Sequence, residues 1–262
     1  MAQQTQVNRV ALFYSAWLKK FPTLSRLAGA AKADVLRQWS GLGYNNRALR
    51  LHELAKHLTE NSRGRLPQTI EELQDLPGIG KYTAHAVACF AFGAAVAVVD
   101  VNVRRIFSRV FWNACSAADL KPEGEIWTLA EKTLPRKNAA EWNQALMDLG
   151  ALVCTARNPQ CSSCPVNSLC TSAFSNAFSV KYSMEKKAEP SFKGIPRRIY
   201  RGRILKALHE KPLTSRQLGE RVVERFHPRD MKWMTRVLET MEKEALIAIQ
   251  GSGERKMICI AQ

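Results

Sequence analysis

The segment LPGIGKYTA, residues 76–84, constrains the fold more than any other part of the chain. Pro77 and the glycines Gly78 and Gly80 interrupt a helix, although the residues on both sides have helical patterns. Two glycines one residue apart allow a tight turn that leaves backbone N–H groups exposed, and the positive end of the next helix dipole adds to them. Lys81 contributes a further positive charge. We therefore predict a loop between two helices that binds phosphate without base preference.

Hydrophobic periodicity predicts that the chain is almost entirely α-helical as far as its cysteine-rich region. Apolar residues recur at helical spacing, as in residues 103–110, and the alternating pattern of strands is nearly absent. A stretch containing Ser, Lys and Pro follows and predicts a linker over residues 176–196. The expected organisation is an all-α domain over residues 1–175, then the linker, then a small domain over residues 197–262.

Residues 197–262 have the pattern of three helices followed by two apolar strands around a glycine turn. This order resembles a winged-helix domain, so we expect a small α+β unit here. The segment contains 15 basic and 8 acidic residues, which suits binding to nucleic acid. A module that docks onto another protein is an alternative that the pattern leaves open.

The charge of the whole chain indicates a polyanionic partner. Its 39 Lys and Arg against 23 Asp and Glu give a formal charge of +16, and nucleic acid is the expected polyanion. A basic surface without a special partner is the plainer alternative. No apolar run reaches the ~18 residues of a membrane span, and the first residues lack the layout of a signal peptide. We expect a cytoplasmic protein that does not contact a membrane.

Asp100 is the strongest candidate for a catalytic side chain. It follows the apolar residues Val98 and Val99 and directly precedes the helical pattern of residues 103–110, so it lies at a helix N-terminus. An Asp at this place commonly caps the helix. A carboxylate held there can also stabilise the positive charge that builds on a sugar ring when a glycosidic bond breaks. One half-buried side chain can serve both purposes.

Four of the seven cysteines fall within residues 154–170, with the spacing C-x6-C-x2-C-x5-C. In a reducing compartment such a group indicates a metal site rather than disulfides. Four thiolates can bind one zinc ion or a cubane iron–sulfur cluster, and their chemistry alone leaves both open. The short spacings favour a single compact loop. The predicted ligands are Cys154, Cys161, Cys164 and Cys170.

LPGIGKYTA followed by VDVNVRR resembles the helix–hairpin–helix DNA glycosylase superfamily, which includes endonuclease III and the adenine DNA glycosylases. The resemblance implies an all-α, two-lobed fold and a [4Fe–4S] cluster on the four cysteines. It also implies that Asp100 is the essential aspartate. Tyr82 stands where members that cleave the DNA strand have a Schiff-base lysine. A phenol cannot form an imine, so we predict a monofunctional glycosylase without strand cleavage.

Two further features of the resemblance concern DNA. Gln3 and Gln4 lie in a segment similar to the one with which adenine glycosylases wedge a glutamine into the duplex, and Tyr44 lies in a segment similar to their second intercalating loop. Such insertion offsets the cost of unstacking when a base is flipped out. The cysteine loop carries Arg157 toward the surface, where we expect it to contact DNA. The expected partner is double-stranded DNA containing a mismatch, bound by a monomer.

The target base follows less directly from the sequence. Adenine glycosylases protonate the departing base with a glutamate just before the segment of Gln3 and Gln4, and this chain starts at Met1. Either the protein is longer, or it lacks this acid and is a catalytically impaired lesion-binding protein. GKYTA with VDVNV is also similar to the thymine/uracil:G mismatch glycosylases. An adenine-glycosylase-like mismatch enzyme is the favoured interpretation.

Overall fold

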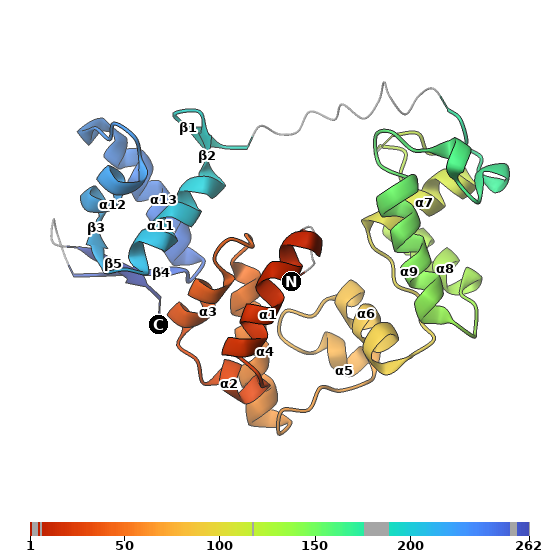
Figure 1. Ribbon diagram of the computed structural model, residues 1–262, viewed down its shortest axis with the longest axis horizontal. Coiled ribbons are helices and arrows are strands. Elements are labelled where there is room, and N and C mark those ends of the chain that lie inside the picture. Colours follow the sequence, from red (N-terminus) through yellow and green to blue (C-terminus); the bar gives the residue numbers. More distant parts are fainter. Residues whose placement is uncertain (2–4, 6, 117, 176–188, 252–255, 262) are drawn as a thin grey trace. The chain divides into compact units, whose positions relative to one another are not determined.

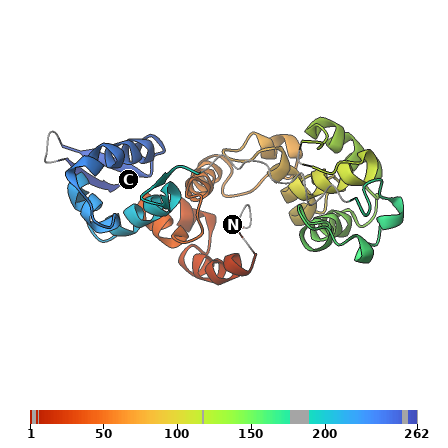
Figure 2. The ribbon, with the colours of Figure 1, turned by 90° about the horizontal axis from the view of Figure 1, so that it is seen from above.

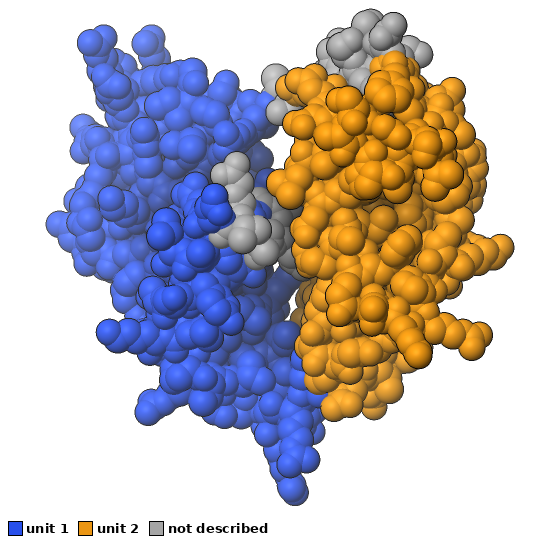
Figure 3. All heavy atoms as spheres, turned by 45° about the vertical axis from the view of Figure 1, so that its right-hand side comes forward, with its two compact units in different colours: residues 1–66, 189–262 blue, residues 67–188 orange. Residues whose placement is uncertain are grey.

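The computed structural model describes residues 1, 5, 7–116, 118–175, 189–251 and 256–261. Gln3 and Gln4, predicted to wedge into DNA, lie outside the described residues. The chain forms two compact units, one of residues 1–66 with 189–262 and one of residues 67–188 (Figure 3). This grouping rests on contacts, and the domain boundaries predicted at residues 175 and 196 stay a prediction. None of the described helices is long and apolar enough to span a membrane.

The unit of residues 67–188 is helical, as predicted (Figure 1). Its α-helices are α5 (Ile70–Gln74), α6 (Lys81–Phe92), α7 (Val101–Trp112), α8 (Glu123–Thr133) and α9 (Ala139–Asp148). A π-helical turn, Leu149–Val153, continues α9, and two 3-10 turns, Cys161–Ser163 and Asn167–Leu169, lie in the cysteine loop.

Helix α7 organises the core of this unit. Its buried residues Val103, Ile106 and Phe107 pack with Ile126 and Trp127 of α8. Because these residues recur at helical spacing, one face of α7 packs against the core. The N-terminus of α7 directly follows an extended segment. The fold thus places Asp100 at the boundary between the packed core and the surface of this unit.

The unit of residues 1–66 with 189–262 contains the remaining elements. Its first part has α1 (Val7–Lys20), α2 (Leu24–Ala28), α3 (Lys32–Trp39) and α4 (Asn46–Asn61). Its second part has β1 (Ser191–Phe192), β2 (Ile195–Pro196), α11 (Arg197–Leu208), β3 (Leu213–Thr214), α12 (Ser215–Val222), a 3-10 turn (Pro228–Asp230), α13 (Met231–Lys243), β4 (Ile247–Gln250) and β5 (Met257–Ile260).

The C-terminal part has the three helices and the strand pair that the sequence predicts (Figures 1 and 2, blue). Strand β5 pairs antiparallel with β4 on one side and with the short β3 on the other, which gives the order β3-β5-β4. Buried residues of α11, α12 and α13 form one apolar cluster with this sheet. Leu36 of α3 and Leu49 of α4 belong to the same cluster.

Candidate active site and cysteine loop

The predicted hairpin joins α5 and α6. Gly78 has a φ of +79°, in the left-handed region that favours glycine. Gly80 is the N-cap of α6, and a Cβ at this position would meet no described atom within 4 Å. The first N–H groups of α6 therefore begin at an open turn, which is the geometry of a phosphate-binding hairpin.

Lys81, the first residue of α6, has a defined place in this turn. Its side chain is exposed, and its Nζ lies 4.2 Å from the centroid of the Trp127 ring. An ammonium over an indole face is held by a cation–π interaction. The predicted phosphate contact of Lys81 is compatible with this position, because the side chain is tethered at the surface rather than buried.

Asp100 is half-buried and caps α7. Its Oδ1 accepts hydrogen bonds from the backbone N–H groups of Asn102 and Val103, both at 2.8 Å. Its Oδ2 accepts a 2.8 Å hydrogen bond from Nδ2 of Asn102. The capping role that is common for such an Asp is thus present, and the carboxylate is fixed in one orientation.

Tyr82 and Asp100 act on each other electrostatically. Burial raises the pKa of the Tyr82 phenol, and the negative charge of Asp100 raises this pKa further. The phenol therefore stays protonated at neutral pH. Tyr82 lies at the start of α6 and Asp100 directly before α7, and the charge of Asp100 is felt at the Tyr82 phenol.

The extended segment before Asp100 is held by two buried side chains. Asn143 of α9 accepts a hydrogen bond from the N–H of Val98 at 2.9 Å and donates to the carbonyl of Val96 at 2.9 Å. His85 of α6 has its Nδ1 2.9 Å from the carbonyl oxygen of Ala97. These contacts fix the backbone that carries the carboxylate.

Two buried arginines of α7 connect the start of this helix with the cysteine loop. Arg105 donates to Oδ1 of Asn102 at 2.9 Å, to the carbonyl of Gly150 at 2.7 Å and to the carbonyl of Cys154 at 2.9 Å. The same Asn102 side chain binds the carboxylate of Asp100. A continuous series of hydrogen bonds therefore runs from the candidate catalytic carboxylate to the first cysteine of the loop.

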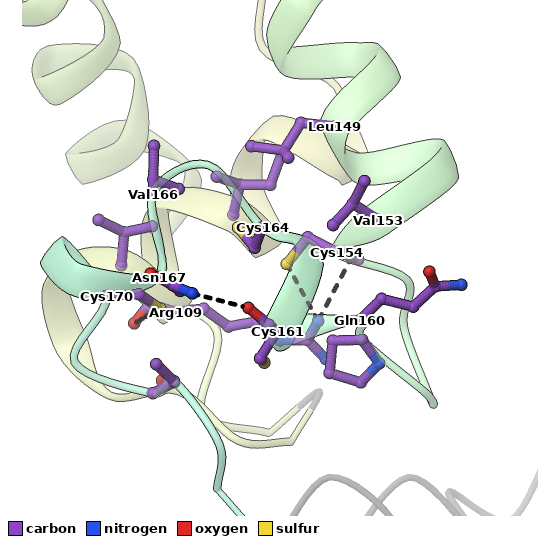
Figure 4. A pocket seen from close by; sticks show the side chains of 15 residues that line it. Arg109, Leu149, Val153, Cys154, Gln160, Cys161, Cys164, Val166, Asn167 and Cys170 are labelled. Carbon is purple, nitrogen blue, oxygen red and sulfur yellow. Dashed lines mark hydrogen bonds between the residues drawn. The ribbon is translucent and has the colours of Figure 1, made fainter.

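Arg109, one turn further along α7, supports the loop itself. It donates to the carbonyls of Thr155 and Ala156, both at 2.7 Å. Its guanidinium also donates to Cys154, with Sγ at 3.3 Å (Figure 4). Its side chain is only 2% exposed. Sequence reasoning missed both arginines. The signal that could have found them is a pair of arginines four residues apart within an otherwise apolar helix face.

The four cysteines line one pocket together with apolar residues such as Leu149 and Val153 (Figure 4). Burial raises the pKa of the Cys170 thiol, and the nearby Cys154, Cys161 and Cys164 also raise it. In the described part of the chain, no three His, Cys, Asp or Glu side chains converge closely enough to hold one metal ion. Four thiols that line one pocket match the four thiolate ligands that an iron–sulfur cluster requires.

The remaining predicted DNA contacts lie on the surfaces of the two units. Tyr44 is 64% exposed and has a φ of +48°. Arg47 fixes its loop by donating to the carbonyl of Gly43 at 3.1 Å and to Oγ1 of Thr5 at 2.8 Å. Thr5 belongs to the segment of the predicted glutamine wedge, and its hydrogen bond with Arg47 places Thr5 beside the Tyr44 loop. Arg157 is exposed in the cysteine loop.

Comparison with known families gives two matches. The family model described as "HhH-GPD superfamily base excision DNA repair protein" matches residues 1–132. The model described as "Iron-sulfur binding domain of endonuclease III" matches residues 154–170. The second match covers the four-cysteine loop from its first to its last ligand, and it confirms the predicted [4Fe–4S] cluster.

Several curated relatives are similar over much of the chain. An adenine DNA glycosylase of Mycobacterium tuberculosis is 39% identical over 257 residues, which are 94% of this chain and 79% of the relative. An adenine DNA glycosylase of Homo sapiens is 45% identical over 171 residues, 65% of this chain. The chain spans 31% of the length of that human relative.

Solved structures also resemble the chain. A thermostable thymine-DNA glycosylase has a TM-score of 0.60 and 31% identity over 65% of this chain and 79% of its own. A trapped endonuclease III–DNA covalent intermediate has a TM-score of 0.59 and 25% identity over 66% of this chain and 79% of its own.

Proposed function

Because the chain belongs to the HhH-GPD superfamily of base excision DNA repair proteins, we propose that it is a DNA glycosylase that excises adenine from mismatched duplex DNA. The carboxylate of Asp100, fixed at the start of α7 beside Tyr82, is the observation that carries the proposal. We assign adenine as the target base because the relatives include the adenine DNA glycosylases of Mycobacterium tuberculosis and Homo sapiens. The proposed enzyme acts as a monomer.

In this proposal one set of residues binds the DNA, and Asp100 acts in the chemical step. The hairpin of Gly78 and Gly80 binds a phosphate through the N–H groups at the start of α6, and Lys81 adds positive charge. The exposed Tyr44 inserts into the base stack, and the target base is flipped out. As the glycosidic bond breaks, the base leaves with the bonding electron pair and the carboxylate of Asp100 stabilises the positive charge on the sugar. Water then adds at C1′, and the proton that this water loses neutralises the negative charge of the departing base.

The cysteine loop has a supporting role in this proposal. Cys154, Cys161, Cys164 and Cys170 would hold the cluster, which when bound would tie the two ends of the loop together. Arg105 and Arg109 bind the loop backbone from α7. The exposed Arg157 is then presented on an ordered loop, where it contacts a phosphate.

The proposed enzyme does not cleave the DNA strand. The phenol of Tyr82 cannot form an imine with the opened sugar, and Lys81 is held over Trp127. We expect no covalent adduct when the protein and a mismatched duplex are treated with borohydride. An adduct of the size of one protein and one strand contradicts this part of the proposal.

An Asp100→Asn variant tests the central step. Asn caps a helix about as well as Asp, so the variant keeps its fold and most of its DNA affinity. The negative charge is lost, and we expect the excision rate to fall by about a hundredfold or more. The assay is single-turnover excision from duplexes with A opposite 8-oxoguanine, A opposite G, T opposite G and U opposite G.

Asp148→Asn is the matched control, because Asp148 is exposed at the end of α9 and its carboxylate binds only Gln144 among the described residues. It should excise adenine at the rate of the unmodified protein. Equal rates for the two variants would overturn the role of Asp100. Excision of T or U but not of A by the unmodified protein would overturn the proposed target base.

A further inference from the structure

The C-terminal part of the chain has the connectivity of a winged helix. The elements follow the order α11, β3, α12, α13, β4, β5, and the sheet has the order β3-β5-β4. In this architecture the helix before the strand pair is the one that enters a groove of a nucleic acid duplex. Here that helix is α13. None of its residues takes part in the chemistry described above.

The start of α13 is held rigidly. Nζ of Lys193 donates to Oδ2 of the buried Asp230 and to the carbonyl of Arg225, both at 2.7 Å. Oδ2 of Asp230 also accepts from the N–H of His227 at 2.9 Å. The ring of Trp233, in the first turn of α13, stacks on Phe192 with 4.0 Å between ring centroids. The direction of α13 is therefore fixed before any ligand binds.

The outer face of α13 is basic. Its apolar residues Met234, Val237, Leu238 and Met241 are buried in the cluster with the sheet. The outer face carries exposed cations at helical spacing, and Arg229 precedes them in the 3-10 turn: Arg229, Lys232, Arg236 and Lys243. Within the described part of the chain, none of these four side chains forms an ion pair.

The acidic residues near α13 reduce this charge only in part. Glu242 accepts a hydrogen bond from the N–H of Ile249 at 3.1 Å, and Glu244 pairs with Arg201. Glu239 and Glu242 are both exposed on α13. The four cations Arg229, Lys232, Arg236 and Lys243 therefore outnumber the two exposed acids of this helix.

The same face lacks the apolar residues that a protein-docking surface needs. Among the described residues of 189–262, the exposed large hydrophobic side chains are Ile199 and Met257, and neither is on α13. The centre of a protein interface is depleted in charge and enriched in aromatic residues. A basic, apolar-poor helix face complements a polyanion instead, and a helix of this kind fits the ~12 Å width of the DNA major groove.

We propose that the outer face of α13 is a second duplex-DNA-binding site, which contacts phosphates through Arg229, Lys232, Arg236 and Lys243. It binds duplex DNA without requiring a mismatch. It therefore adds affinity for undamaged DNA that does not depend on base flipping at the hairpin.

The test compares two double variants of the full, cluster-loaded chain. Lys232→Ala/Arg236→Ala removes two charges from the proposed site. Lys206→Ala/Lys211→Ala removes two exposed charges at the end of α11 and beyond it. The affinity for an undamaged duplex is measured by fluorescence anisotropy over a range of salt concentrations. This readout needs no excision, so it is independent of the proposed glycosylase activity.

Each phosphate contact contributes about one unit to the slope of log affinity against log salt. We expect the α13 variant to bind more weakly and with a slope smaller by about 2, and the α11 variant to match the unmodified protein. The charge-conserving Lys232→Arg/Arg236→Lys variant should keep the original slope, which separates lost charge from altered folding. An unchanged slope in the α13 variant, or an equal decrease in both alanine variants, overturns the proposal.

Discussion

Gly150 is the position at which a single methyl group should disturb the candidate active site most. It lies in the π-helical turn after α9, and a Cβ built there would lie 2.6 Å from Cβ of Asn102 and 3.2 Å from Cδ1 of Ile106. Real Cβ atoms essentially never show an approach of 2.6 Å, so either α7 or the turn has to move. Asn102 is the residue whose side chain binds the carboxylate of Asp100.

The size of the effect of Gly150→Ala follows from these contacts. Forcing one extra carbon into a packed site costs about 1–3 kcal/mol of folding stability. In a domain of this size, this cost lowers Tm by roughly 2–12 °C. Because the displaced Asn102 moves the carboxylate that it holds, we also expect excision to slow by about tenfold to a hundredfold.

Gly124→Ala is the control for this prediction. Gly124 lies in α8, and a Cβ there meets no described atom within 4 Å. The same substitution should raise stability by up to about 1 kcal/mol, because alanine is the better helix former. Thermal unfolding and single-turnover excision are measured for both variants under identical conditions. If Gly150→Ala is as stable and as active as Gly124→Ala, the close packing between the turn and α7 does not control the site.

Three further predictions follow from buried polar side chains. Arg109→Met removes the donors to two carbonyls of the cysteine loop, so the purified variant should contain less iron and absorb less visible light, whereas Arg157→Met at the exposed loop position should keep its iron. Asn143→Ala leaves the N–H of Val98 and the carbonyl of Val96 without this partner and should lower the free energy of unfolding by about 2–4 kcal/mol; Gln144→Ala, at the exposed neighbouring position, should change it little in the same urea titration. Burial lowers the pKa of His209, and its two ring nitrogens have no hydrogen-bond partner among the described residues. As the pH falls below about 6.5, His209 therefore takes up a proton in the unfolded chain before it does so in the folded protein. Between pH 7 and pH 5 the free energy of unfolding should fall less for His209→Leu than for the unmodified protein, and equal decreases would contradict this role of His209.

The sequence predicts the helices well because residues close together along the chain determine each of them. Apolar residues at helical spacing define α7, and the glycines at the hairpin define where α6 begins. The strand pair β4 and β5 is also predicted from its two short apolar runs. Strand β3 is missed because its two residues are too short for a periodic pattern. The packing of Leu36 with the C-terminal helices joins segments far apart in the chain, and no local pattern encodes it.

The residues of the candidate site likewise fall into those that the sequence predicts and those that it does not. Asp100, the hairpin and the four cysteines are found from the sequence because each depends on residues that are close together along the chain. The supporting residues Arg105 and Gly150 are not, because their roles arise only where α7 packs against the turn after α9. An arginine on a helix is usually exposed. Its burial here is tolerated because backbone carbonyls accept its hydrogen bonds.

The capping role of Asp100 and its proposed catalytic role are compatible when the hydrogen bonds are counted. A carboxylate offers about four acceptor sites. In the described structure Oδ1 accepts from two backbone N–H groups, and Oδ2 accepts from one side-chain amide. One site on Oδ2 is thus available to an approaching positive charge. Because the cap already fixes the carboxylate, little reorganisation is needed when charge develops on the sugar, and this is the condition under which a fixed negative group accelerates bond cleavage most.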